Sequence, residues 1–315
     1  RVGQAAGREL AALGINLLLG PNLDVLETPS PEGPADFGAQ VFGGDPFWVG
    51  QLAQAYIDGL HTGSQGGRSQ GGLAVFARHF PGLGSTNRRV EEEVPTVRRT
   101  LEELRQVELA PFFNVTGGAP LAPGVVDGLV TAHIRFQGLQ GNIRAATRPV
   151  SLDPAALQLL TSQPEMVQWR AGGGVLLSDS LGARALTRFY DTNYNGRLVA
   201  RDALLAGNDL LYLSNFQTPG DPDAFATIRA TLEFFAQKYR EDTAFAGRVD
   251  EALLRVLQLK YRLYPQFDPV QVLRPAGGLS ALDHAQTNAF EVARRAASLI
   301  SPASADELAE RLPDA

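Results

Sequence analysis

The most informative stretch of this chain reads Gly172-Gly173-Gly174-Val175-Leu176-Leu177-Ser178-Asp179. An apolar run this short, preceded by glycines and followed by a carboxylate, is typical of a buried strand that brings an acidic group to the edge of a sheet. The glycines come before the strand, whereas those of a dinucleotide-binding turn follow one. The stretch therefore predicts a strand that ends in a functional acid and does not indicate a nucleotide site.

Four other apolar runs end in polar residues in the same way. They are 15–19 before Asn22 and Asp24, 73–76 before Arg78 and His79, 129–130 before His133, and 210–213 before Ser214 and Asn215. Helical patterns alternate with these runs, which favours parallel strands joined by right-handed crossovers. Because the carboxyl ends of the strands carry the working groups of a parallel α/β barrel, the pattern predicts one shared pocket.

The hydrophobic pattern and the local composition of the chain predict three parts. Residues 1–264 carry the strands and helices of a barrel domain and close with long helical patterns at 223–239 and 245–264. A linker bearing proline and glycine is predicted over 265–282, and a helix and tail over 283–315 that we expect to lead toward a further domain. The helical pattern at 1–10 has no capping residue ahead of it, so we expect sequence before Arg1 and a barrel incomplete at its N-terminal side.

Composition excludes several classes of protein. The 315 residues are 44% hydrophobic and 20% charged, as in an ordinary globular protein. The net charge of -6 and the pI near 5.3 argue against a nucleic-acid surface. No apolar stretch reaches the roughly 18 residues of a membrane span, and the absence of cysteine excludes disulfides and thiolate chemistry. The cellular compartment and the oligomeric state stay open.

A series of short blocks, in the order in which they occur, resembles glycoside hydrolase family 3. The block Arg78-His79-Phe80-Pro81-Gly82 is similar to the family signature Lys-His-Phe-Pro-Gly. The other blocks are Gly14-Ile15-Asn16, Pro21-Asn22-Leu23-Asp24-Val25, Val41-Phe42-Gly43-Gly44-Asp45-Pro46, Val94-Pro95-Thr96-Val97, Glu108-Leu109-Ala110-Pro111-Phe112, Thr131-Ala132-His133, Leu177-Ser178-Asp179 and Ala206-Gly207-Asn208-Asp209-Leu210. The bacterial β-N-acetylglucosaminidase branch is the most similar. The resemblance implies a TIM-type (β/α)8-like barrel, followed here by C-terminal helices.

The resemblance assigns the role of catalytic nucleophile to Asp179, because the aspartate of the Ser-Asp block has that role in the family. A retaining glycosidase needs one ionised carboxylate beneath the sugar and an acid about 5 Å away from it. The alternative is that Asp179 caps a helix that begins near Leu181.

The resemblance also implies substrate-binding residues. His79 matches a histidine that binds sugar hydroxyls, and Arg78 stands where the family has lysine. Asp24 and His133 lie at other strand ends and are further candidates. Each has a structural alternative: His79 satisfied by the backbone at a strand end, Asp24 bracing a loop, and His133 buried in the fold, which is the interpretation that we favour for it.

Two positions depart from the family pattern. The branch carries an aspartate and a histidine as acid/base pair in the loop after the Phe-Pro-Gly turn, and this pair is absent. Glu91 stands where the histidine would be, and a partly desolvated glutamate can act as general acid, although its place in the run 91–93 is typical of a solvated loop. Gln40 replaces a sugar-binding arginine, so it offers a hydrogen bond without the charge.

Two functions therefore stay open. The first is hydrolysis of β-glycosidic bonds by a retaining double displacement, with N-acetylglucosaminides as candidate substrates and the acid supplied by Glu91 or by another domain. The second is a catalytically impaired barrel that binds carbohydrate or serves as a structural protein. Neither needs a cofactor, since carboxylates alone can hydrolyse an acetal. No metal site is predicted, because His61 and His284 lack paired ligands.

Overall fold

The computed structural model describes residues 1–28, 40–65, 72–86, 92–118, 122–265, 282 and 285–296 of the chain. Its centre is a parallel sheet of four strands in the order β1-β2-β4-β6. The strands are β1 (Leu17–Asn22), β2 (Ala74–Phe80), β4 (Gly128–Thr131) and β6 (Val175–Ser178). A parallel bridge between Leu177 and Leu210 adds the run at 210–213 beside β6. The five predicted runs thus lie next to one another, in chain order.

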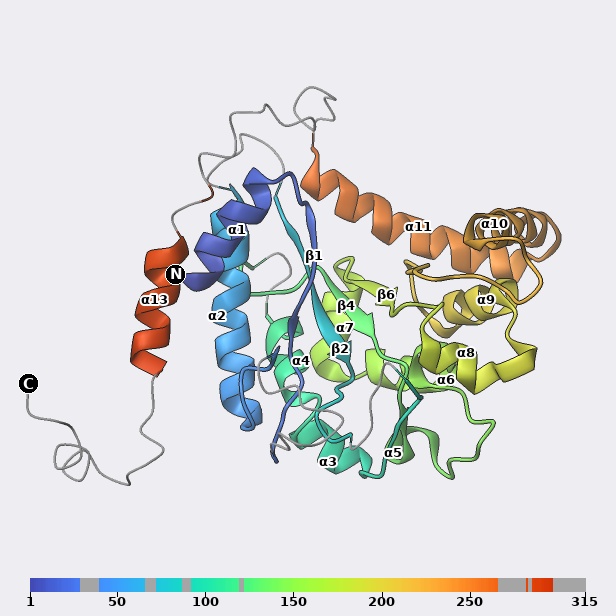
Figure 1. The fold of residues 1–315 in the computed structure, drawn as a ribbon, viewed down its shortest axis with the longest axis horizontal. Coiled ribbons are helices and arrows are strands. Elements are labelled where there is room, and N and C mark those ends of the chain that lie inside the picture. Colours follow the sequence, from blue (N-terminus) through green and yellow to red (C-terminus); the bar gives the residue numbers. More distant parts are fainter. Residues whose placement is uncertain are drawn as a thin grey trace, which may run out of the picture.

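The parallel sheet with helical crossovers confirms the predicted α/β fold, and its arrangement is that of a TIM-like barrel wall. In the part of the chain that the structure describes, the sheet does not close into a ring, and β1 and the segment at Leu210 are its two edges (Figure 1). The carboxyl ends of the strands all point to the same side, where α3 (Leu101–Gln106) and α5 (Gln137–Gln140) lie.

The remaining helices surround the sheet. They are α1 (Val2–Ala12), α2 (Pro46–Gln65), α4 (Ala110–Thr116), α6 (Pro154–Thr161), α7 (Pro164–Ala171), α8 (Arg184–Tyr190), α9 (Gly196–Ala206), α10 (Ala224–Glu241), α11 (Thr243–Leu263) and α13 (Ala285–Ala296). A second, two-stranded parallel sheet pairs β3 (Thr96–Val97) with β5 (Arg135–Phe136). None of the helices within the described ranges is long and apolar enough to cross a membrane.

The helices begin where the sequence provides caps. Asp153 accepts hydrogen bonds from the first backbone N–H groups of α6, and Pro154 fills its first position. Thr100 and Glu103 form a reciprocal capping box at the start of α3. Asp223 and Asp242 cap the two long helices α10 and α11, which correspond to the predicted patterns at 223–239 and 245–264.

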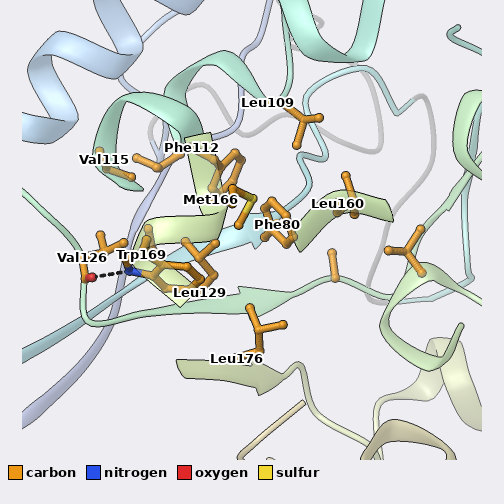
Figure 2. Packing of buried hydrophobic residues seen from close by; sticks show 14 of the residues in the cluster. Phe80, Leu109, Phe112, Val115, Val126, Leu129, Leu160, Met166, Trp169 and Leu176 are labelled. Atoms are coloured by element: carbon orange, nitrogen blue, oxygen red, sulfur yellow. Dashed lines mark hydrogen bonds between the residues drawn. The ribbon is translucent and has the colours of Figure 1, made fainter. Parts of the chain in front are cut away.

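Side chains alternate between the two faces of the sheet along each strand, and both faces are buried against helices. One face packs on the helices that follow the strands: Figure 2 shows Leu129 beside Trp169 of α7, whose indole Nε1 donates to the backbone oxygen of Val126 at 2.8 Å, and Met166 and Leu176 belong to the same buried cluster. The other face packs against α11. Its cluster consists of Ala74, Phe76, Val130, Val175, Leu177 and Leu259.

The predicted division into domains stays a prediction. Residues 266–281, nearly all of the predicted linker, and the tail from 297 lie outside the described residues. The helix predicted after the linker is present as α13, which lies beside α1 (Figure 1).

Candidate active site

The carboxyl edge of the sheet brings four of the predicted residues together. Asp24, His79, His133 and Asp179 lie at or just beyond the ends of β1, β2, β4 and β6, which are consecutive neighbours. Backbone hydrogen bonds continue past the regular strands: Leu23 N–H donates to the Arg78 oxygen at 2.6 Å, Ala132 to Phe80 at 2.8 Å, and Asp179 to Thr131 at 3.0 Å. The edge is therefore one continuous rim.

Asp24 and His79 form a buried pair on this rim. The Asp24 side chain is 0% exposed, and its Oδ2 accepts a hydrogen bond from His79 Nδ1 at 2.8 Å. Its Oδ1 accepts from the Leu83 N–H at 2.7 Å, which ties down the turn after β2. A carboxylate is only an acceptor, so Nδ1 carries a proton and Nε2 of His79 remains for another partner. Asp24 thus braces the turn and orients the histidine.

Arg78 precedes His79 and is half-buried. Its side chain forms no hydrogen bond or ion pair with the described residues, and its backbone pairs with Asn22 of β1. The guanidinium is therefore a cation at the rim whose donors are not taken up by the described fold. The sequence placed Asn22 at a strand end without assigning it a role: its Oδ1 accepts from the Asp24 N–H at 2.8 Å, while its Nδ2 is buried without a partner.

His133 is fully engaged inside the protein. Its Nε2 lies 2.9 Å from the backbone oxygen of Ser180, and its Nδ1 lies 2.7 Å from Ser151 Oγ. Since a carbonyl can only accept, Nε2 carries the proton and Nδ1 accepts from the serine hydroxyl. Burial lowers the pKa of His133, against the opposing charge of Asp179 and the hydrogen bond to Ser180. Both nitrogens of the neutral ring are therefore engaged, so none is left for a sugar. The hydrogen bond from Nε2 holds Ser180, the residue that follows Asp179.

Asp179 follows β6 and is half-buried. Its Oδ1 accepts from the Ser180 N–H at 2.7 Å, and its Oδ2 has no hydrogen bond with the described residues. Helix α8 begins only at Arg184, with Ala183 in the capping position, so Asp179 does not cap it. Ser180 is fixed from two sides, by His133 and by its own Oγ, which donates to the Ser214 oxygen at 2.9 Å. One carboxylate oxygen is thus held and the other is available.

A polar layer under the rim supports these residues, and its members were not singled out from the sequence. Thr131 Oγ1 donates to Asn208 Oδ1 at 2.7 Å, and Asn208 Nδ2 donates to the Ser151 oxygen at 2.9 Å. Ser178 Oγ accepts from the Tyr212 N–H at 3.0 Å. The signal available in the sequence was their position directly beside the strand-end residues.

Glu108 holds the turn that follows β2 from below. It is 1% exposed and accepts hydrogen bonds from Ser85 Oγ and from Arg99, whose Nε lies 3.2 Å from Glu108 Oε1. Burial raises the pKa of Glu108, while the Ser85 hydrogen bond and the Arg99 charge oppose the rise. Gly82 passes directly over it with φ of +128°, and a Cβ added there would lie 2.8 Å from Glu108 Cβ. This position requires glycine.

Two predicted residues gain no contact with the rim from the structure as described. Gln40 is exposed and forms no hydrogen bond with the described residues. Glu91 lies outside the described residues, so the proton donor stays a prediction. Within the described ranges, no group of three or more His, Asp or Glu side chains is placed to hold a metal ion.

Comparison with known proteins gives a consistent family. The profile "Glycosyl hydrolase family 3 N terminal domain" matches residues 1–259. A β-hexosaminidase of Shewanella frigidimarina is 29% identical over 207 residues, which are 66% of this chain and 51% of that protein. A β-hexosaminidase of Idiomarina loihiensis is 27% identical over 238 residues, 75% of this chain and 61% of that protein. The chain spans about half the length of the curated relatives it matches.

Solved structures agree. A glycoside hydrolase family 3 β-N-acetylglucosaminidase from Paenibacillus sp. superposes with a TM-score of 0.65 at 25% identity, covering 89% of this chain and 47% of that one. A family 3 glycosyl hydrolase from Mycobacterium smegmatis gives a TM-score of 0.62 at 25% identity, covering 82% of this chain and 67% of that one.

Proposed function

The chain belongs to glycoside hydrolase family 3, and we propose that it hydrolyses β-glycosidic bonds by a retaining double displacement in which Asp179 is the nucleophile. The observation that carries the proposal is the state of the Asp179 carboxylate. Its Oδ1 is held by the Ser180 N–H while its Oδ2 is free of described partners, at the rim where the strands end. An oriented, ionised carboxylate with one available oxygen suits attack on an anomeric carbon.

In this mechanism Asp179 Oδ2 forms a bond to the anomeric carbon while the bond from that carbon to the leaving oxygen breaks. A general acid gives its proton to the leaving oxygen, and a water molecule then cleaves the glycosyl ester with the same group acting as base. His79 Nε2 and the Arg78 guanidinium are proposed to bind hydroxyls of the sugar. Asp24 and His133 are proposed as positioning residues rather than ligands, because their polar atoms are already bonded.

The general acid is proposed to be Glu91 or a residue of another domain. Among the described carboxylates of this region, Glu108 does not suit the task, since it is 1% exposed and bonded to Ser85 and Arg99. A general acid has to reach the leaving oxygen within hydrogen-bond distance.

N-Acetylglucosaminides are the proposed substrates. The support is the activity of the relatives, which are β-hexosaminidases among the curated proteins and a β-N-acetylglucosaminidase among the structures at 25% identity. Gln40, which stands where the branch has an arginine, is expected to weaken binding of the sugar, since a neutral amide forms weaker hydrogen bonds than a guanidinium.

Hydrolysis of an aryl β-N-acetylglucosaminide tests the proposal. We expect release of the aryl alcohol above background, and a fall of kcat by at least ~1000-fold in Asp179→Asn, because the nucleophile is lost while size and fold are kept. Asp191→Asn is the matched control, since Asp191 is exposed and lies outside the rim. Turnover that is equal in Asp179→Asn and the unaltered chain would reject the proposal, and absence of any turnover would favour the carbohydrate-binding alternative.

A further inference from the structure

A hollow lies over the small sheet β3–β5. It consists of two adjoining cavities of about 590 and 480 Å³ that share the residues Thr96, Arg98 and Arg135. We name it the β3–β5 cavity and define it by these three residues together with Glu93, Gln137, Asn142 and Arg144. Volumes of this size are typical of small-molecule sites. We propose that the β3–β5 cavity binds a carboxylate-bearing part of the glycan substrate, which makes acidic glycans the preferred substrate class.

The lining carries an excess of positive charge. Arg98, Arg135 and Arg144 contribute three guanidinium groups, against the single carboxylate of Glu93. This contrasts with the chain as a whole, whose net charge is -6. A local cationic hollow on an acidic protein attracts anions, repels cations and gives a neutral ligand no comparable attraction.

Arg135 forms the fixed floor of the cavity. Its Nη2 donates to the Val94 oxygen at 2.9 Å and its Nη1 to the Arg144 oxygen at 3.4 Å, while its Nε is buried without a partner. Its guanidinium carbon also lies 6.0 Å from the centre of the Phe189 ring. These contacts hold the guanidinium in place, so it supplies a charge that does not need to be ordered when a ligand binds.

Arg98 and Arg144 supply the groups that can close on an anion. Both are exposed, and neither side chain forms a hydrogen bond or an ion pair with the described residues. A guanidinium presents paired donors that match a carboxylate. The neutral side chains of Thr96, Gln137 and Asn142 add donors and acceptors for hydroxyl groups. This combination suits an acidic sugar better than an inorganic anion alone.

The residues that line the cavity are close in the chain to those of the candidate active site, or bonded to residues beneath it. Arg135 follows His133 by two residues, and its N–H donates to the Pro95 oxygen at 3.0 Å. Ser85, which lines the cavity, is bonded to Glu108 under the turn that contains His79 and Gly82. A glycan held at the Asp179 rim can thus place its next unit over β3 and β5. The inference rests on the proposed function, of which it specifies the substrate class.

Two disaccharides distinguish the carboxylate from the sugar. β-N-acetylglucosaminyl-(1→4)-glucuronate carries a carboxylate, and β-N-acetylglucosaminyl-(1→4)-glucose is its neutral counterpart. We expect the ratio of kcat/KM, acidic to neutral, to fall about tenfold in the double variant Arg98→Ala/Arg144→Ala, since two exposed charge-assisted contacts are lost. Arg240→Ala is the matched control, because Arg240 is an exposed arginine on α10. A ratio that is the same in all three proteins would overturn the inference.

Calorimetric binding to the Asp179→Asn protein separates this inference from the proposed function. The glucuronate disaccharide is expected to bind about tenfold more tightly than the glucose disaccharide, with a preference that shrinks at high salt and in Arg98→Ala/Arg144→Ala. Tighter binding of the glucuronate disaccharide, without turnover by the unaltered chain, would contradict the proposed function but support the β3–β5 cavity as a carboxylate site. Equal affinity for both disaccharides would reject the β3–β5 cavity as a carboxylate site. Competition by inorganic phosphate alone at millimolar concentration would identify a general anion site and contradict an acidic-glycan site.

Discussion

At the scale of single residues, the position of Asp179 is set by contacts of its neighbours. His133 and Ser214 hold Ser180 from two sides, and the Ser180 N–H then holds one oxygen of the carboxylate. Because the second oxygen forms no described hydrogen bond, the fold orients the Asp179 carboxylate and leaves this oxygen available for another partner. This is the arrangement expected when a reactive group is positioned by its supporting shell.

The pair of Asp24 and His79 gives a prediction about stability. Asp24→Ala removes acceptors from two buried donors, His79 Nδ1–H and the Leu83 N–H, so we expect the free energy of unfolding to fall by about 2–4 kcal/mol. Urea unfolding followed by circular dichroism measures this change.

Asp24→Asn is the companion variant. Its amide oxygen can still accept from Leu83, and His79 can change tautomer to accept from the amide, so a smaller loss is expected than in Asp24→Ala. Equal stability of Asp24→Ala and the unaltered chain would show that this pair does not brace the turn.

The residue scale also shows what sequence could predict. The four rim residues Asp24, His79, His133 and Asp179 are found at adjacent strand ends, because apolar runs that end in polar residues reveal where strands stop. The sequence could not say that both carboxylate oxygens of Asp24 and both ring nitrogens of His133 already have hydrogen-bond partners. That depends on partners such as Leu83, which lies 59 positions from Asp24 in the chain.

At the scale of elements, His61 joins three parts of the fold. It lies on α2 and contacts the Pro123 oxygen through Nδ1 at 2.6 Å and Asp127 Oδ2 through Nε2 at 3.0 Å. Arg262 of α11 approaches the other Asp127 oxygen at 3.7 Å. Since both ring nitrogens face acceptors, the charged imidazolium fits this place. Burial lowers the pKa of His61, but the hydrogen bond and charge of Asp127 outweigh it and raise the pKa above the ordinary value.

This contact predicts a pH dependence of stability. A raised pKa in the folded state means that the folded protein binds the proton more tightly, so the stabilisation is complete below about pH 6.5 and is lost as pH rises through the folded pKa. We expect His61→Gln to remove a decline of about 0.5–1 kcal/mol in the free energy of unfolding above pH 6.5. Urea unfolding at intervals from pH 5.5 to 8.5 measures it.

His133 provides a separate window for comparison. Its lowered pKa makes the folded state bind its proton less tightly, so its effect appears as a loss of stability when pH falls below about 6.5. The His61→Gln variant is therefore expected to keep this acidic decline. Identical slopes above pH 6.5 in His61→Gln and the unaltered chain would contradict a charged His61 contact.

At the scale of the whole molecule, Asp209 joins the sheet to its surrounding helices. Its carboxylate contacts Arg170 of α7 and, from α11, Arg248 at 3.0 Å and Arg255 at 3.3 Å, and it accepts from the Leu176 N–H of β6 at 3.0 Å. The sequence placed Asp209 in a family-like block without assigning it a role. The arginines come from distant helices, and no local pattern predicts such a convergence.

The overall architecture was largely predictable, because alternating apolar runs and helical patterns are local signals. The parallel sheet and the long helices α10 and α11 are found where expected. The run at 210–213 contributes only a bridge at Leu210 rather than a full strand. The small sheet β3–β5 was missed, since two-residue strands such as Thr96–Val97 are too short to show a period.

Covalent trapping is the most direct test of the central claim that the free oxygen of Asp179 attacks a sugar. A fluorinated β-glycosyl fluoride that forms the glycosyl-enzyme quickly and loses it slowly is incubated with the chain, which is then digested and mapped by mass spectrometry. We predict one glycosyl ester on the peptide that contains Leu177-Ser178-Asp179 and its absence in Asp179→Asn. An ester on another carboxylate, or an unlabelled Asp179 in a chain that cleaves the substrate, would contradict it.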